Sequence, residues 1–85
     1  MVTPNAHWNL RIVRHEIVGL HGESLYTFAL HECHYTDGVL LSVTKEPVKV
    51  IANSIEDLKW YLERCKEALD KPVLDDDTLE EIKDD

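Results

Sequence analysis

The residues with the most potential for chemistry lie together at positions 31–35, which read HECHY. Two histidines, a glutamate and a cysteine supply imidazole, carboxylate and thiolate groups, which are the ligands that zinc prefers in proteins. A cysteine next to a histidine is also the minimal pair for nucleophilic catalysis. Whether these side chains can act together depends on the element that carries them.

The HECHY residues are predicted to end a β-strand that enters a hairpin. Residues 8–18, 25–35 and 39–45 are rich in β-branched, aromatic and alternating apolar residues. GLHGES separates the first two runs and TDG the last two, and both segments contain turn-forming glycines. The three runs therefore predict three antiparallel strands. The third is expected to bend at Pro47 and to continue through VKVI at 48–51.

Alternation along a strand separates the members of the cluster. It places His31 and Cys33 on one face and His34 on the other. A zinc site would then need ligands from elsewhere, with His15 and Cys65 as the candidates. The spacing matches no common zinc pattern, so neither a metal nor any other cofactor is expected. The two cysteines are read as small buried hydrophobes.

The predicted hairpin register also argues against a catalytic role for the cluster. If the Asp-Gly pair forms a two-residue loop, Cys33 lies opposite Ser42 and His31 opposite Thr44. His34 then points away from the Cys33 thiol and cannot serve as its base. The chain is therefore not expected to be an enzyme.

A single helix is predicted from Ile55 to Lys71. Ser54 followed by Asp57 forms a capping-box pattern, and Pro72 disfavours a helical residue before it. Apolar residues recur along this segment at spacings of three and four, which predicts one face packed on the sheet. They are Ile55, Leu58, Tyr61, Leu62, Cys65, Ala68 and Leu69.

Together these elements predict one small α+β domain, a three-stranded antiparallel sheet (a βββ meander) packed on one C-terminal α-helix. The domain spans residues 8–71, after an N-terminal extension at 1–7. Residues 72–85 form an acidic, partly ordered C-terminal segment, whose PVL start is expected to pack beside the helix. Thr78 and Glu81 are expected to cap one further turn. A chain of 85 residues lies near the size at which one core barely stabilises a fold.

The net charge of −8 is concentrated at the C-terminus, where residues 70–85 carry eight acids and two lysines. The remaining residues contribute only −2 and offer no basic face, so direct nucleic-acid binding is not expected. The tail is read either as a solvated terminus or as a lure for a basic partner. Its candidate partner-binding acids are Asp75, Asp76, Asp77, Glu80 and Glu81.

The chain shows no sign of a membrane or secretory segment. No apolar run approaches the roughly 18 residues of a membrane span, so no membrane association is expected. The start, MVTPNAHW, has neither a basic region nor an apolar region typical of a signal peptide. A cytoplasmic location with reduced thiols is therefore expected.

Two features indicate a protein partner. Trp60 falls on the polar side of the helix beside Arg64, either as a binding residue or lying over the rim of the sheet. Both sheet faces carry apolar residues, but one helix covers only one face. The uncovered set is expected to include Phe28, Leu41 and Val43, and a homodimer is the expected way of covering it.

The phrases WNLRIVR, ALHECHY followed by DG, TKEPV, SIEDLK and KPVLD occur in this order. This order resembles an uncharacterised family of small bacterial proteins with three strands followed by a helix. The resemblance covers roughly residues 8–75. It implies the same fold and a cytoplasmic bacterial or phage origin, and it implies no particular activity.

The sequence therefore predicts a non-enzymatic protein–protein interaction module that self-associates. One alternative is an acidic inhibitor or nucleic-acid mimic, such as a phage anti-defence protein, whose tail carboxylates occupy a basic groove. A third is an antitoxin-like regulator, because strands followed by an S-x-E-x-L helix occur in such domains. No DNA-binding segment follows the helix here.

Overall fold

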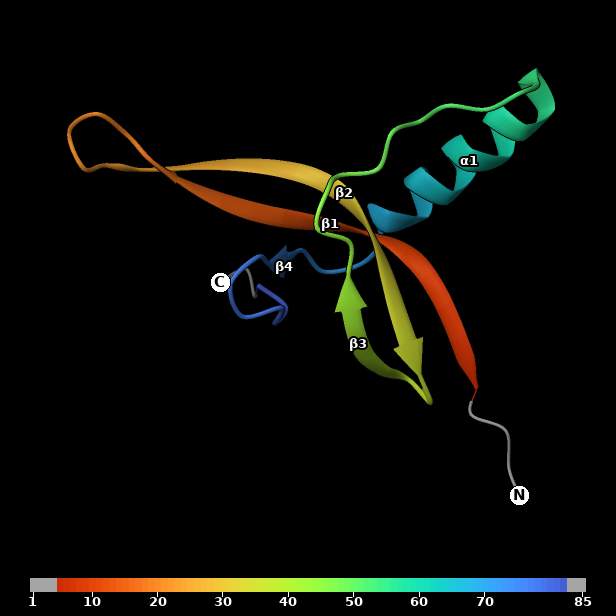
Figure 1. Cartoon of the computed structure of the whole chain (residues 1–85), viewed down its shortest axis with the longest axis horizontal. Helices are drawn as coiled ribbons and strands as arrows, with labels where there is room; N and C mark the ends of the chain where they lie inside the picture. The colour runs from red at the N-terminus through yellow and green to blue at the C-terminus, as the bar shows by residue number, and fades with distance from the viewer. Residues whose placement is uncertain (1–4, 83–85) are drawn as a thin grey trace.

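The computed structural model describes residues 5–82 and contains one four-stranded sheet and one helix (Figure 1). The elements are β1 (Ala6–Val18), β2 (Ser24–Thr36), β3 (Val39–Val43), α1 (Ile55–Ala68) and β4 (Leu74–Asp75). The sheet order is β3-β2-β1-β4. The α+β class is confirmed, and β1, β2 and β3 are antiparallel neighbours. The sheet is nevertheless mixed, because β4 adds an unpredicted strand parallel to β1.

Parts of the predicted N-terminal extension and of the acidic C-terminal segment lie outside the described residues. Residues 1–4 of the predicted N-terminal extension lie outside the described residues, and β1 already begins at Ala6. Lys83, Asp84 and Asp85 of the acidic segment also lie outside them. The rest of that segment includes β4 and the turn after it.

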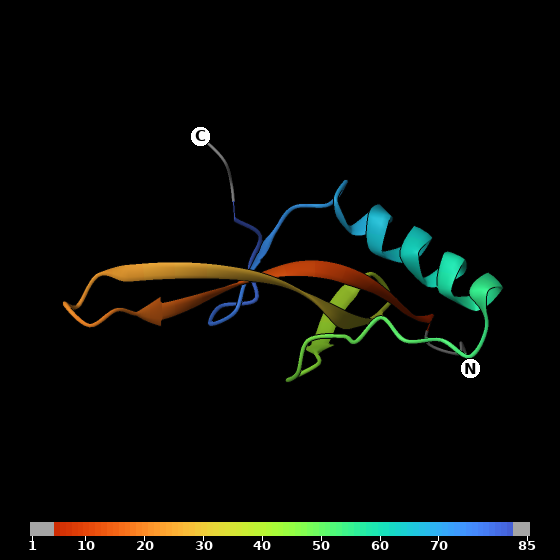
Figure 2. The same cartoon turned by 90° about the horizontal axis from the view of Figure 1, so that it is seen from above.

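The hairpin of β1 and β2 is the longest feature of the molecule. Its ladder runs from Ala6 opposite Thr36 to Val18 opposite Ser24. β4 pairs with only two residues of β1, so one end of the hairpin extends as a two-stranded ribbon beyond the other elements (Figures 1 and 2). We call residues 16–27 the arm. The radius of gyration is 15.1 Å, whereas a compact 85-residue domain has about 12 Å.

The turn between β2 and β3 is the two-residue loop that the sequence predicts. Asp37 and Gly38 have φ angles of 51° and 80°, which a two-residue hairpin of this type requires. After the first two pairs, however, the register shifts by one residue at a bulge. Cys33 consequently lies opposite Val43, and the predicted pairing with Ser42 is wrong.

The segment after β3 does not continue as a strand. The chain bends at Lys45 and Glu46, and the predicted strand over 48–51 is absent from the described structure. Only isolated hydrogen bonds remain: the N–H groups of Thr44 and Val48 donate to the β2 carbonyls of Glu32 and Leu30, each over 2.9 Å. The regular ladder is interrupted because the bend inserts extra residues: Thr44 and Val48 are four positions apart, whereas the β2 carbonyls that they reach are two positions apart.

The helix begins where its cap predicts and ends early. The Ser54 hydroxyl accepts a hydrogen bond from the N–H of Asp57 over 3.1 Å. The helix ends at Ala68 rather than Lys71. The next three N–H groups bond to carbonyls three residues back, at 3.1–3.2 Å, so the chain tightens into a 3₁₀-type turn before Pro72.

The helix covers the face of β1 that carries Leu10, which is 3% exposed (Figure 2). Ala68 is fully buried at this contact. Three residues of the predicted buried stripe are instead exposed, because the helix turns that edge away from the strands. They are Ile55, Leu62 and Leu69, with 73%, 50% and 70% of their surface exposed.

The opposite face of the sheet holds the tightest core. Val13, Cys33 and Leu74 are buried in one cluster, with Tyr35, Leu40 and Val43 packed against it. Leu74 enters this cluster because β4 pairs with β1 at Val13. The expectation that residues 72–74 pack beside the helix is therefore wrong.

The turn after β4 is capped differently from the prediction. Asp75 Oδ1 accepts from the N–H groups of Asp77 and Thr78, at 2.9 and 3.2 Å. The Thr78 hydroxyl accepts only from the N–H of Glu80, and Glu81 pairs with Leu74 across the turn. The carboxylate that caps the turn is thus that of Asp75.

Replacing Leu74 by alanine should show how much this core depends on β4. Leu74→Ala removes a side chain that is 2% exposed, so we expect a loss of about 2–4 kcal/mol in the free energy of unfolding. Ile51→Ala, at a site that is 72% exposed, is the control and should change it by less than about 0.5 kcal/mol. Urea unfolding measures both, and equal losses would contradict this assignment of the core.

Candidate functional site

A row of basic side chains on β1 contacts the C-terminal segment. Arg11, 7% exposed, donates to the Pro72 carbonyl over 2.7 Å and to the Tyr35 hydroxyl over 3.2 Å. Its guanidinium also lies 3.5 Å from the Glu81 carboxylate. A buried guanidinium is stable only when polar partners surround it, so these contacts hold the segment against β1.

Two further ion pairs continue the row. Arg14 donates to Asp75 Oδ2 over 3.0 Å, and His15 Nδ1 lies 3.2 Å from Asp76 Oδ2. Three of the five acids predicted to meet a partner, at positions 75, 76 and 81, therefore contact this chain's own β1. Asp77 and Glu80 lie on the exposed turn.

Asp75 is the acid most strongly stabilised in its charged form. The hydrogen bond from Arg14 lowers the pKa of its carboxyl, and the N–H groups of Thr78 and Asp77 lower it further. Its charged form therefore stabilises both the pairing of β4 with β1 and the turn that follows.

His15 of β1 and His31 of β2 lie diagonally across the two strands and form part of a hydrogen-bonded chain. His31 Nδ1 lies 2.8 Å from the Thr44 carbonyl, and its Nε2 lies 2.9 Å from His15 Nε2. His15 Nδ1 completes the chain at Asp76. Both outer partners only accept, so three hydrogen bonds need three protons on four ring nitrogens. The chain thus links β1, β2, the residue after β3 and the C-terminal segment.

The candidate metal ligands do not converge. Among residues 5–82, no three histidine, cysteine, aspartate or glutamate side chains lie close enough to share an ion. Cys33 is buried in the core, and burial raises the pKa of its thiol. Cys65 belongs to α1, on the other side of the sheet, and burial also raises the pKa of its thiol. Raised pKa values favour thiols over the thiolates that metals bind.

The alternation predicted for HECHY is confirmed. His34 Nε2 lies 3.1 Å from the Glu32 carboxylate on the helix-bearing face. Cys33 is fully buried on the opposite face, where its Sγ lies 3.9 Å from the His31 carbonyl. The adjacent cysteine and histidine therefore do not form a nucleophile and base.

Trp60 lies at the rim of the sheet and is 52% exposed. Its ring meets the Trp8 ring edge-on at 6.3 Å, and the Arg64 guanidinium lies 5.5 Å from its ring centre. Trp60 thus forms a half-exposed aromatic pair with Trp8 on the outer side of the helix. The pair leaves part of both rings open to a partner.

An open, mainly apolar hollow lies between α1 and β2, and the sequence does not reveal it. A hollow of about 500 Å³ is floored by Ile12, Phe28, Leu30, Leu62, Cys65 and Leu69. It adjoins a second hollow of about 680 Å³, and the two share Phe28 and Leu69. We call the combined surface the trough. Its charged border residues are Lys66, Lys71, the Asp75-paired Arg14 and Glu81.

The remaining predicted interface residues lie apart from one another. Phe28, 61% exposed, is in the trough, whereas Leu41, 62% exposed, is the extra residue at the β3 bulge. Val43 packs on the buried cluster of the opposite face. The predicted shared face for Phe28, Leu41 and Val43 is wrong because the bulge reverses the alternation after it.

Leu62 and Leu69 are the trough residues that sequence reasoning misplaced in the core. One sequence signal was present: with Ile55 they repeat at intervals of seven, which forms a narrow apolar edge along the helix. This edge lies beside the apolar stripe that contacts the sheet and makes the apolar face of the helix wider. A stripe this wide is consistent with two separate contacts.

Comparison with known proteins identifies no relative. No family model matches the chain, and no curated protein and no solved structure is significantly similar to it. These comparisons therefore supply neither a family nor a function. Within the described part of the chain, no helix combines the length and apolarity needed to cross a membrane.

Acid should weaken the fold through Asp75. Its folded-state pKa is lowered, so its contribution is complete above the unfolded value of about 4 and is lost as the pH falls below it. We expect wild type to lose more stability than Asp75→Asn between pH 6 and pH 3. Asp77→Asn, which changes an exposed neighbour, should follow wild type. Parallel losses in wild type and Asp75→Asn, measured by thermal unfolding, would argue against this ion pair.

The histidine chain predicts an unusual tautomer. Because the Thr44 carbonyl only accepts, His31 should carry its proton on Nδ1. Long-range proton–nitrogen correlation spectra at pH 8 should show a protonated Nδ1 and an unprotonated or shared Nε2. Asp76→Asn should leave the His31 Nδ1 signal in place while it changes the His15 signals. A spectrum in which only Nε2 of His31 is protonated would be inconsistent with this chain.

Proposed function

We propose that this protein is a non-enzymatic interaction module whose working form is a homodimer. The exposed area of the single chain carries the proposal. A folded monomer of 9.8 kDa exposes about 5,200 Å², whereas this chain exposes 6830 Å². The excess is roughly 1,600 Å² per chain, within the range that each subunit of an obligate homodimer buries.

The composition of that surface supports the same proposal. The arm is a two-stranded ribbon, and such ribbons are only marginally stable in water by themselves. Its large apolar side chains are nearly half to fully exposed, and Leu20 is completely so. The set comprises Ile17, Val18, Leu20, Leu25 and Tyr26. A partner that covers them would stabilise the arm as well as bind it.

The alternative functions have weaker support. For an acidic inhibitor or nucleic-acid mimic, the carboxylates must face a basic partner, but Asp75, Asp76 and Glu81 are paired with β1. An antitoxin-like regulator is supported only by the order of strands and helix. Self-association uses surfaces that the fold leaves open, so it is the function we favour.

Native mass spectrometry of the recombinant protein, purified without chelator over a range of concentrations, tests the proposal. We expect a dimer mass without a metal adduct, with the same mass at high salt because burial of apolar area drives the association. A monomer at every concentration would refute self-association. A monomer with one stoichiometric zinc would also refute it, and His31 and Cys33 would be the first residues to mutate.

A further inference from the structure

The trough has two properties that together specify what it accepts. Its floor is apolar and open, with Phe28 and Leu69 exposed to 61% and 70%. Its border carries Lys66 and Lys71, together with Arg14, which is paired with Asp75, and Glu81, which contacts Arg11, so the two lysines give it a positive edge in a chain whose net charge is −8. The matching ligand is therefore a segment that combines apolar side chains with acids.

The arm has this combination. Val18, Leu20 and Leu25 are exposed to 70%, 100% and 50%. Glu16 and Glu23 lie on the same ribbon, and both are exposed. The arm is thus apolar with acidic flanks, whereas the trough is apolar with a positive edge.

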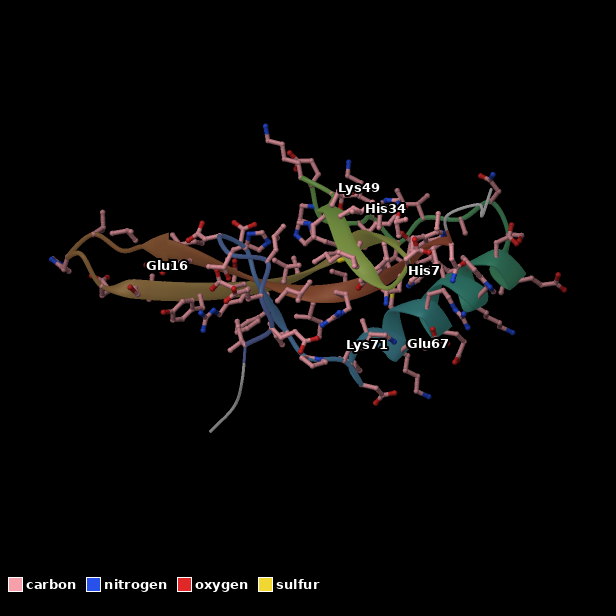
Figure 3. The ribbon with its side chains drawn as sticks, turned by 90° about the horizontal axis from the view of Figure 1, so that it is seen from below. His7, Glu16, His34, Lys49, Glu67 and Lys71 are labelled. Atoms are coloured by element: carbon pink, nitrogen blue, oxygen red, sulfur yellow. The ribbon has the colours of Figure 1, made fainter. Side chains whose placement is uncertain are left out.

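The arm cannot fill the trough of its own chain. Phe28 lies where the arm leaves the rest of the sheet, and the ribbon extends away from α1 beyond that point (Figures 1 and 2). Figure 3 shows Glu16 out on the ribbon and Lys71 on a separate part of the molecule, at the end of the helix. A straight hairpin would have to fold back on itself to bring these groups together.

We propose that the arm of each subunit lies in the trough of a second copy, so that two chains exchange arms. This inference rests on the proposed self-association. A twofold axis makes the exchange reciprocal, because the surface that donates the arm also receives one, and the assembly closes at two subunits. Each chain then covers both its arm and its trough, and the area buried in this way reduces the excess of roughly 1,600 Å² per chain.

Native Cys65 provides a probe of this arrangement, because it lines the trough while Cys33 is fully buried. We would introduce Val18→Cys, Leu20→Cys and Leu25→Cys singly. All three sites are at least half exposed, so the variants should fold. A disulfide forms only when the two Cβ atoms are about 3.5–4.5 Å apart. Three arm positions sample the length of ribbon that the trough would hold.

Two controls make the cross-link specific. Each arm variant is repeated with Cys65→Ser, which removes the trough thiol and should abolish the bond. Lys49→Cys places a thiol at an exposed site on the side of the sheet opposite α1 (Figure 3). It should not cross-link to Cys65.

We expect mild oxidation to give a covalent dimer from at least one arm variant, at least tenfold more than from Lys49→Cys. Peptide mapping should place the bond between the arm and Cys65. If native spectra show a dimer but no arm variant cross-links to Cys65, arm exchange is overturned while self-association stands. If the protein stays monomeric and no variant cross-links, both proposals fail. A monomer that takes up a foreign protein in the trough would also overturn arm exchange.

Discussion

Burial of the Arg11 guanidinium is the interaction that ties the C-terminal segment, residues 72–82, to β1. A cation that is 7% exposed needs polar partners, and β2 provides only the Tyr35 hydroxyl. The others, the Pro72 carbonyl and the Glu81 carboxylate, lie after the helix. The chain must therefore return to the edge of β1 once α1 ends. This return pairs β4 with β1 and brings Leu74 onto the central cluster.

The second constraint is that one helix cannot cover two faces of a sheet. Here α1 covers the Leu10 side, while β3 and the C-terminal segment enclose the Val13 side. Much of the apolar surface that remains lies in two places, the arm and the outer edge of the helix. Both are stable in water only at a cost, and this cost is the basis of the proposed self-association.

The acidic segment has a different role from the one its composition indicates. Asp75, Asp76 and Glu81 neutralise the basic row of β1, and Asp75 also caps a turn. Their charges act within the chain. The surface that we propose for a partner is the trough, whose apolar floor is bordered by Lys66 and Lys71 although the protein as a whole is acidic.

The sequence by itself determined the features that depend on neighbours a few residues apart. These are the alternation that separates Cys33 from His34, the turn at Gly38 and the cap at Ser54. The tertiary structure alone decided the pairing of β4, the bulge that moved Val43 to the core side, and the exposure of Leu69. Periodicity, φ preference and capping are local. The contacts that place β4 join residues 61 positions apart, which no local pattern specifies.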